Sequence, residues 1–192
     1  MTRADLARRL ATAAIGIPLL ALALFCCLPF AGASTPVDAG ARNLALLKQY
    51  GELGRKGDYA AQAAMWAPDA INNGRPMSID EIRSQLEDIH RVFPDHHSSA
   101  VETTASGDLV IVLTRTSGTH RGVAQTGIYG GMLRGARPQG KHFDVLRAHW
   151  WRFKDGKIVW HQVVADDLSM MRQLGLIPDT LPAGYLVTPA KD

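Results

Sequence analysis

Two β-rich runs joined by Asp155-Gly156 constrain the fold of this chain more than any other feature. The runs are FDVLRAHWWRF, which ends at Phe153, and KIVWHQVVAD, which begins at Lys157. An Asp-Gly connection favours a type I′ turn, because both central residues of that turn need positive φ. The sequence therefore predicts an antiparallel hairpin in which Lys154 lies opposite Lys157.

Helical patterns precede this hairpin. Leu44, Leu47 and Tyr50 have helical spacing, and the glycines that follow are expected to end this first helix. An Ala-rich segment that opens at Asp58 predicts a second, short helix that ends near Trp66. The amino-terminal part of the domain is therefore expected to be helical.

The clearest helix begins after Ser78. Ser78 and Glu81 form a capping box, apolar residues then recur at helical spacing, and Pro94 ends the pattern. A β-branched run follows Asp108, and a last short helix, LSMMRQL, stops at Gly175. Helices first and antiparallel strands second indicate an α+β fold and not a doubly wound parallel sheet.

Counting outward from the turn assigns the hairpin side chains to two faces. In the absence of a bulge, four pairs share one face: Trp151 with Trp160, His149 with Gln162, Arg147 with Val164, and Val145 with Asp166. The other face receives Trp150 opposite His161. A face that mixes tryptophan with His, Gln and Asp is typical of a concave ligand pocket. Any bulge would exchange the faces beyond it.

These residues also have ordinary structural interpretations. Asp166 and Asp167 both precede a helix, and a single N-cap accounts for one of them. His149 and His161 are more often hydrogen-bonded, partly buried residues than catalysts, and the tryptophans suit a core or a subunit interface. Aromatic residues on the second face predict a homodimer through the outer surface of the sheet.

The N-terminus has the organisation of a secretory signal. A basic start, MTRADLARR, precedes an uncharged run that ends in Ala31-Gly32-Ala33. We expect residues 1–33 to be a cleaved signal peptide, residues 34–43 to be a linker, and the mature protein to be secreted or periplasmic. The run is also long enough to span a bilayer, so a membrane anchor is the alternative.

Charge and cysteine content exclude several classes of function. Of 21 basic and 18 acidic side chains, three arginines and one aspartate precede residue 34, so 18 and 17 remain in the mature chain. This near-neutral balance argues against a nucleic-acid partner. Cys26 and Cys27 both lie in the signal segment, which leaves the mature chain without a thiol. No metal site is predicted, because the seven histidines lack ligand spacing.

Several short motifs occur in a characteristic order. They are FPD at 93–95, SGD at 106–108, GTHRG at 118–122, GK at 140–141, RFKDGKI at 152–158, HQVVAD at 161–166 and MMRQLG at 170–175. With these motifs the chain resembles the SnoaL-like polyketide cyclase (ester cyclase) family, and we assign residues 44–177 to that domain and 178–192 to a tail. The resemblance implies the nuclear-transport-factor-like fold, a curved and mostly antiparallel sheet wrapped around N-terminal helices to form a cone-shaped pocket. Enzymes and non-catalytic binding domains share that fold, so it does not decide the function.

The resemblance also implies residue roles and a mechanism without a cofactor. In characterised members one Asp is the general acid/base of an intramolecular aldol ring closure, and the spacing to QLG places that Asp at Asp166 rather than Asp167. A carboxylate in an apolar cavity has a raised pKa, so it can accept and return a proton. With His149, His120 or Gln162 as donors to an enolate oxygen, the predicted catalytic residues are Asp166, His149 and His120. The predicted substrate-binding residues are Asn73, Trp66, Trp151, Trp160, Gln162 and His161.

Two departures from the family limit what the resemblance implies about the reaction. His161-Gln162 stands where the family commonly has His-Trp, and the Gly127 to Gly140 loop is longer than usual. Export also argues against antibiotic cyclisation inside the cell. We therefore expect an exported protein that cyclises, isomerises, dehydrates or hydrolyses a small hydrophobic carbonyl compound. The alternative is a non-enzymatic ligand-binding or scaffold domain.

Overall fold

The computed structural model describes residues 36–178 and residue 180. The predicted signal peptide and nearly all of the predicted tail lie outside these residues. In the part of the chain that is described, no helix is both long and apolar enough to cross a membrane.

The described chain folds into helices, strands and one 3-10 turn. The helices are α1 (Pro36–Arg55), α2 (Tyr59–Ala64), α3 (Ile79–Val92) and α4 (Asp167–Gln173). The strands are β1 (Trp66–Asn72), β2 (Arg75–Pro76), β3 (His97–Ser106), β4 (Leu109–Thr119), β5 (His142–Lys154) and β6 (Lys157–Ala165). The 3-10 turn, Ile128–Gly131, lies in the long loop between β4 and β5.

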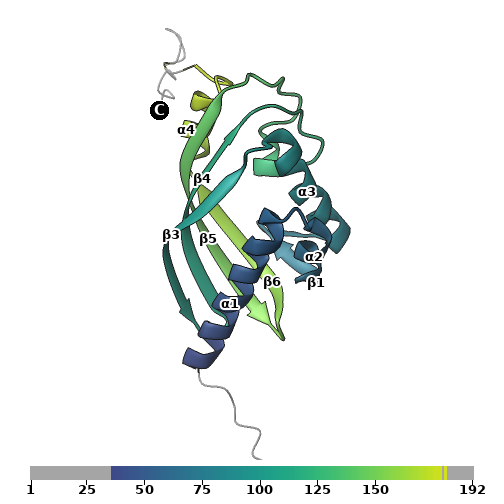
Figure 1. Ribbon diagram of the computed structural model, residues 1–192, viewed down its shortest axis with the longest axis vertical. Helices are drawn as coiled ribbons and strands as arrows, with labels where there is room; N and C mark the ends of the chain where they lie inside the picture. The colour runs from purple at the N-terminus through teal and green to yellow at the C-terminus, as the bar shows by residue number, and fades with distance from the viewer. Residues whose placement is uncertain (1–35, 179, 181–192) are drawn as a thin grey trace, which may run out of the picture. The chain divides into compact units, whose positions relative to one another are not determined.

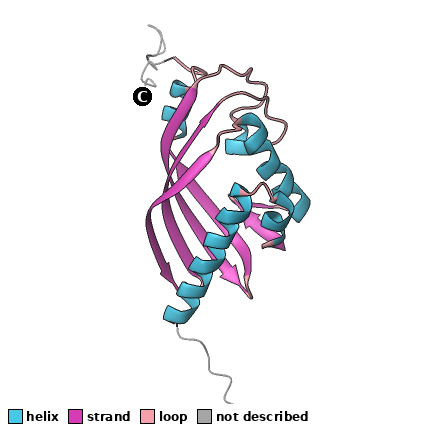
Figure 2. Ribbon diagram, viewed as in Figure 1, coloured by secondary structure: helices cyan, strands magenta, loops and turns pink. Residues whose placement is uncertain are grey.

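The strands form one mixed sheet in the order β2-β1-β6-β5-β4-β3. Neighbouring strands are antiparallel except for β1 and β6, which are parallel. The sheet curves, and α1, α2 and α3 lie along one side of it, with α1 against β3 and β4 (Figures 1 and 2). The predicted α+β class is confirmed.

Helix α3 begins where the capping box predicts. The Ser78 backbone N–H donates to Glu81 Oε2 at 2.9 Å, and the Glu81 backbone N–H donates to Ser78 Oγ at 3.2 Å. Two N–H groups that the helix cannot satisfy internally are thereby paired. The helix ends at Val92, two residues before Pro94.

Helix α1 is longer than the sequence pattern predicts at both ends. Residues 36–43, expected to be a linker, form its first turns, where Asn43 Nδ2 donates to the carbonyl of Gly107 at 2.8 Å. The helix also continues through Gly54, where a Cβ atom would come within 2.8 Å of the Gln62 side chain. Close packing against α2 therefore requires a glycine that reads as a helix end in the sequence alone.

The β5–β6 hairpin turns at Asp155 and Gly156, with positive φ values of 49° and 76°. Lys154 pairs with Lys157, as predicted. A bulge then interrupts the register: Phe153 pairs with Ile158, but Arg152 pairs with Trp160, so Val159 is an extra residue. Beyond this point every predicted pair on β6 is displaced by one residue.

The bulge decides which side chains reach the inner face of the sheet. Trp151 pairs with His161, and His149 pairs with Val163. The predicted pairs of Trp151 with Trp160 and of His149 with Gln162 are therefore wrong, because the count assumed no bulge. His161 moves to the face of Trp151, and Trp160 moves to the opposite face.

A buried carboxylate ties the long loop to α3. Asp88 is fully buried and accepts from the Gln125 and Thr126 backbone N–H groups at 3.0 and 2.6 Å. It also accepts from the Thr126 hydroxyl and pairs with Arg91. The start of the Gly127–Gly140 loop is therefore held against the helix.

Candidate functional site

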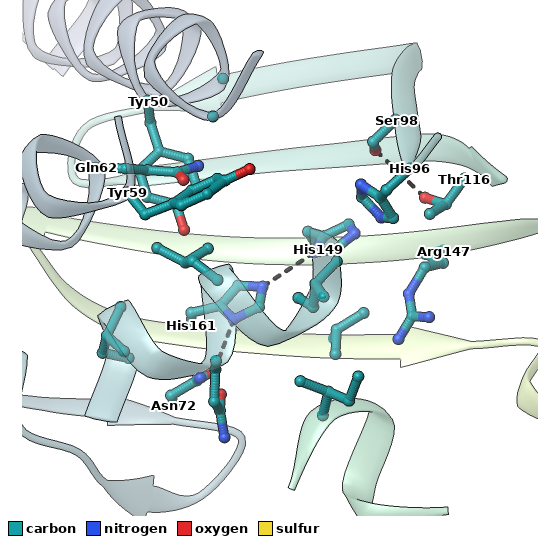
Figure 3. A pocket seen from close by; sticks show the side chains of 18 of the residues that line it. Tyr50, Tyr59, Gln62, Asn72, His96, Ser98, Thr116, Arg147, His149 and His161 are labelled. Carbon is teal, nitrogen blue, oxygen red and sulfur yellow. Dashed lines mark hydrogen bonds between the residues drawn. The ribbon is translucent and has the colours of Figure 1, made fainter. Parts of the chain in front are cut away.

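A cavity of about 1980 Å³ lies between the helices and the inner face of the sheet. Its lining comes from α1, α2, α3 and the start of α4, from β1 and β3 to β6, and from the start of the long loop. Figure 3 shows labelled side chains from α1, α2 and the strands that converge on this space.

One wall of the cavity is aromatic. Trp66 and Trp151 meet edge to face with ring centroids 5.8 Å apart, and Tyr50 lies 5.4 Å from Trp151. Burial raises the pKa of Tyr50 to about 12, so its hydroxyl stays protonated at neutral pH. Aromatic side chains bury a large apolar area in rigid geometry, so this wall suits a flat hydrophobic ligand.

Three polar residues on the same wall form a hydrogen-bonded chain (Figure 3). His161 Nδ1 lies 2.8 Å from Asn72 Oδ1, and His161 Nε2 lies 3.0 Å from His149 Nδ1. The Asn72 amide nitrogen donates to Met77 Sδ at 3.4 Å, which orients its oxygen toward His161. Each contact in the chain therefore joins one donor atom to one acceptor atom.

The direction of this chain fixes both tautomers. Since Asn72 Oδ1 only accepts, His161 donates from Nδ1 and accepts at Nε2. His149 then donates from Nδ1, and its Nε2 carries a lone pair. No described residue donates a hydrogen bond to that Nε2 atom, and His149 lines the cavity.

Burial keeps both histidines neutral. Desolvation, with a contribution from Arg147, lowers the pKa of His149 to about 4. Desolvation also holds the pKa of His161 well below its ordinary value, helped by His149 and Arg147. The His161 ring stacks on Trp151 at 3.9 Å between centroids, which fixes its plane.

A second polar pair lines the cavity further along β5. Arg147 is 7% exposed, and its Nη1 lies 3.6 Å from Asp167 Oδ1 at the start of α4. The guanidinium carbon lies 4.5 Å from the centroid of the Tyr129 ring, which is a cation–π geometry. This pair places one cation and one anion beside the histidine chain.

Comparisons with known proteins agree with this architecture. The family model described as SnoaL-like polyketide cyclase matches residues 44–174.

The chain belongs to the SnoaL-like polyketide cyclase family.

Several solved structures share the SnoaL-like fold. AclR from Streptomyces galilaeus is 23% identical, with 74% of this chain and 86% of that chain covered and a TM-score of 0.58. A SnoaL-like polyketide cyclase from Agrobacterium tumefaciens is 18% identical, with 74% and 99% covered and a TM-score of 0.55. TsrD from Streptomyces laurentii is 19% identical, with 71% and 97% covered and a TM-score of 0.59. At these identities the likeness shows the fold alone, and no curated protein matches the chain.

Six of the nine site residues predicted from the SnoaL-like sequence lie in the cavity lining. They are Trp66, Asn73, His149, Trp151, His161 and Gln162. Asn73 also has a structural task in the β1–β2 turn, because its Oδ1 accepts from the Val163 backbone N–H at 2.9 Å. The Gln162 amide donates to the carbonyl of Val163 at 3.2 Å.

Asp166 does not face the cavity, and its predicted placement there is wrong. Its side chain is exposed and accepts from the Ser169 backbone N–H at 3.1 Å as the N-cap of α4. Hydrogen bonds with the side chain and then the backbone of Ser169 lower the pKa of Asp166, whereas the predicted mechanism needs a raised one. The β6 bulge explains the error, because it turns Asp166 outward and Asp167 inward.

His120 and Trp160 also lie outside the cavity lining. His120 is fully buried beside Phe93, with ring centroids 5.7 Å apart, and burial lowers the pKa of His120. Trp160 pairs with Arg152 on the outer face of the sheet. Their predicted places in the pocket are therefore wrong.

Four lining residues that take part in the contacts described above were not among the predicted site residues. Asn72 and Asp167 each adjoin a predicted residue, and Arg147 and Tyr50 were assigned to a pairing and a helix without a site role. Knowledge of the bulge would have identified Asp167. No sequence signal distinguishes Asn72 from Asn73, because both occur in the same dipeptide.

Proposed function

We propose that this SnoaL-like protein binds a small hydrophobic carbonyl compound and transfers a proton on it without a cofactor. The observation that carries the proposal is the Asn72–His161–His149 chain, which leaves an acceptor nitrogen on the cavity wall beside an aromatic surface. A positioned imidazole within reach of substrate is the usual arrangement for general acid/base catalysis.

In the proposed reaction, His149 Nε2 takes a proton from the carbon next to the substrate carbonyl. The enolate then attacks a second carbonyl or is reprotonated at another carbon, and the imidazolium returns the proton. His161 accepts from His149 Nδ1 throughout, and Asn72 holds His161 in the accepting tautomer. Aldol ring closure and isomerisation both begin with this proton abstraction. Dehydration and hydrolysis would use the same two histidines, His149 and His161, with proton removal and proton return in a different order.

Hydrogen–deuterium exchange on a ketone tests the proton transfer directly. The probe is 2-tetralone in D₂O, with exchange next to the carbonyl followed by proton NMR. Wild-type protein is expected to accelerate exchange over buffer, and His149→Gln to lose roughly 10²–10⁴-fold of the enzymatic rate. His142→Gln is the matched control, because His142 is exposed and outside the cavity lining.

Two results would contradict the enzymatic proposal. Wild-type protein that gives only the buffer rate would favour the binding-domain alternative. Full activity in His149→Gln would remove His149 from the mechanism.

We also propose that the protein is exported and cleaved after Ala33. The support is the basic start, the uncharged run and the small residues of the sequence. N-terminal sequencing of the exported protein should begin at Ser34, and thiol reagents should not label it. Recovery of residue 1 in a membrane fraction would support the anchor instead.

A homodimer through the outer face of the sheet is the third proposal. Leu146 and Val164 are 46% and 61% exposed there, close to Trp150 and Trp160 on the same face. Sedimentation at micromolar concentration should show a dimer that Val164→Asp dissociates. Val123→Asp is the control, since Val123 is 50% exposed in the loop after β4. A monomeric wild type would overturn the proposal.

A further inference from the structure

Arg147 is a buried cation whose hydrogen-bonding groups are not used by the described part of the chain. Its side chain is 8% exposed, and no described residue accepts a hydrogen bond from the guanidinium. The separation of 3.6 Å between Nη1 and Asp167 Oδ1 exceeds hydrogen-bonding distance. Among residues 36–178 and 180, neither of these two buried atoms has a hydrogen-bond partner.

This arrangement is costly for a purely structural ion pair. Removing a charge from water is compensated only when the pair has good geometry and its remaining donors are satisfied. Here Asp167 supplies the opposite charge and Tyr129 a cation–π contact, but neither accepts an N–H from Arg147. The guanidinium therefore retains donors for a further partner in the cavity that it lines (Figure 3).

We propose that Arg147 binds a carboxylate of the ligand, so that the substrate is a small hydrophobic carboxylic acid. This inference rests on the proposed function for the carbonyl group and adds the acidic group. The planar guanidinium matches a carboxylate with two parallel N–H donors. Asp167 opposes a dianion at the same place, which favours a singly charged carboxylate over a phosphate.

The position of Arg147 connects this subsite to the histidine chain. Arg147 and His149 both face inward on β5, and the positive charge of Arg147 contributes to the lowered pKa of His149. Desolvation is the larger cause of that lowered pKa, and a bound carboxylate offsets only the contribution of Arg147, which acts to raise the pKa of His149. The ligand would thereby make His149 a stronger base once it is bound.

Isothermal titration calorimetry with two matched compounds tests the subsite. The probes are 2-naphthoate and methyl 2-naphthoate, which share an aromatic body and differ in charge. Wild-type protein is expected to bind the acid at least 10-fold more tightly than the ester, as a charge-assisted hydrogen bond requires. Neither probe has a proton next to a ketone, so binding is measured independently of catalysis.

Variants then test whether Arg147 causes the preference for the acid over the ester. Arg147→Met should abolish it by weakening acid binding roughly 10–100-fold while ester binding stays unchanged. Asp167→Asn should strengthen acid binding, because the ligand no longer competes with Asp167 for the guanidinium. The control is Arg115→Met, since Arg115 is exposed and pairs with Asp144 outside the cavity lining.

The comparison of acid and ester in wild-type protein needs no variant, so it holds even if Arg147→Met does not fold. Equal affinities, no binding of either compound, or tighter binding of 2-naphthyl phosphate than of the acid would overturn the proposal. If His149-dependent exchange on 2-tetralone persists in these cases, the proposed function stands without the subsite. If the acid preference is present and exchange is absent, the subsite stands and the enzymatic proposal falls.

Discussion

The histidine chain and the Arg147–Asp167 pair lie in one cavity but are satisfied in opposite ways. In the chain, both His161 nitrogens lie within 3.0 Å of a partner, and the partner asparagine is itself oriented by Met77. In the pair, the nearest charged atoms are 3.6 Å apart and form no hydrogen bond. A satisfied network fixes the position of a catalytic group, whereas an unsatisfied pair remains able to take a new partner.

Breaking the histidine chain is expected to have the largest effect on exchange activity. His161→Phe keeps an aromatic ring next to Trp151 but removes the acceptor for His149 Nδ1. Loss of the group that orients a catalytic imidazole costs roughly 10²–10⁴-fold. The 2-tetralone exchange rate measures this loss, and an unchanged rate would mean that His149 acts without His161.

Removing the Arg147–Asp167 ion pair and breaking the histidine chain are expected to have opposite effects on the free energy of unfolding. Arg147→Met combined with Asp167→Leu replaces two charges by apolar groups and should be neutral or stabilising by up to about 4 kcal/mol. Asn72→Leu, which leaves the His161 Nδ1–H without its acceptor, should destabilise by about 1–3 kcal/mol. Urea unfolding of both variants checks the contrast. Equal destabilisation would show that the ion pair is as structural as the chain.

Acid should weaken the folded state through the histidine chain. The folded pKa of His149 is about 4, against an ordinary value of 6.5, so only the unfolded chain takes up this proton between those values. Stability is therefore full above pH 6.5 and falls as the pH drops toward 4, by up to about 1.4 kcal/mol per pH unit for each such histidine. Thermal melting from pH 7 to 4 measures the slope. It should become shallower in His149→Gln, and an unchanged slope would contradict the assignment.

The smallest expected effect concerns the neighbouring aspartates. Asp166→Asn retains a good N-cap on α4, so both stability and exchange activity should stay close to wild type. Asp167→Asn should alter carboxylate affinity, because Asp167 faces Arg147. Calorimetry on the two variants separates them. A loss of exchange activity in Asp166→Asn would restore Asp166 as a proton-transfer residue.

The sequence predicts the fold where local signals decide the structure. Ser78 and Glu81 define the start of α3, and Asp155-Gly156 defines the hairpin turn, because each acts over a few residues. The glycines of α1 wrongly predict a helix end, because packing against Gln62 outweighs the low helix propensity of Gly54. Residues 38–43 are likewise helical because this part of α1 packs against the sheet, and no local sequence pattern indicates that packing.

The candidate site is predicted less well than the fold, because one inserted residue in β6 decides which side chains face the cavity. The bulge at Val159 exchanges the faces of every residue up to α4, which brings His161 and Asp167 inward and takes Trp160 and Asp166 outward. A bulge depends on twist and on packing across strands, so alternation along the sequence does not reveal it. The Asn72–His161 contact joins residues 89 positions apart and has no local signal at all.

Because Asp88 holds the base of the long loop, the rest of the loop can change in sequence and length. Two of the hydrogen bonds to Asp88 come from the backbone of Gln125 and Thr126, so they tolerate many side chains at the first of these positions. Beyond the anchor, Tyr129 reaches the cavity while residues 137–140 are exposed. The loop tip can therefore be shortened, lengthened or grafted from a relative while its base stays fixed. Directed evolution of ligand size in this scaffold can be confined to the loop residues that line the cavity, 127–131 and 134.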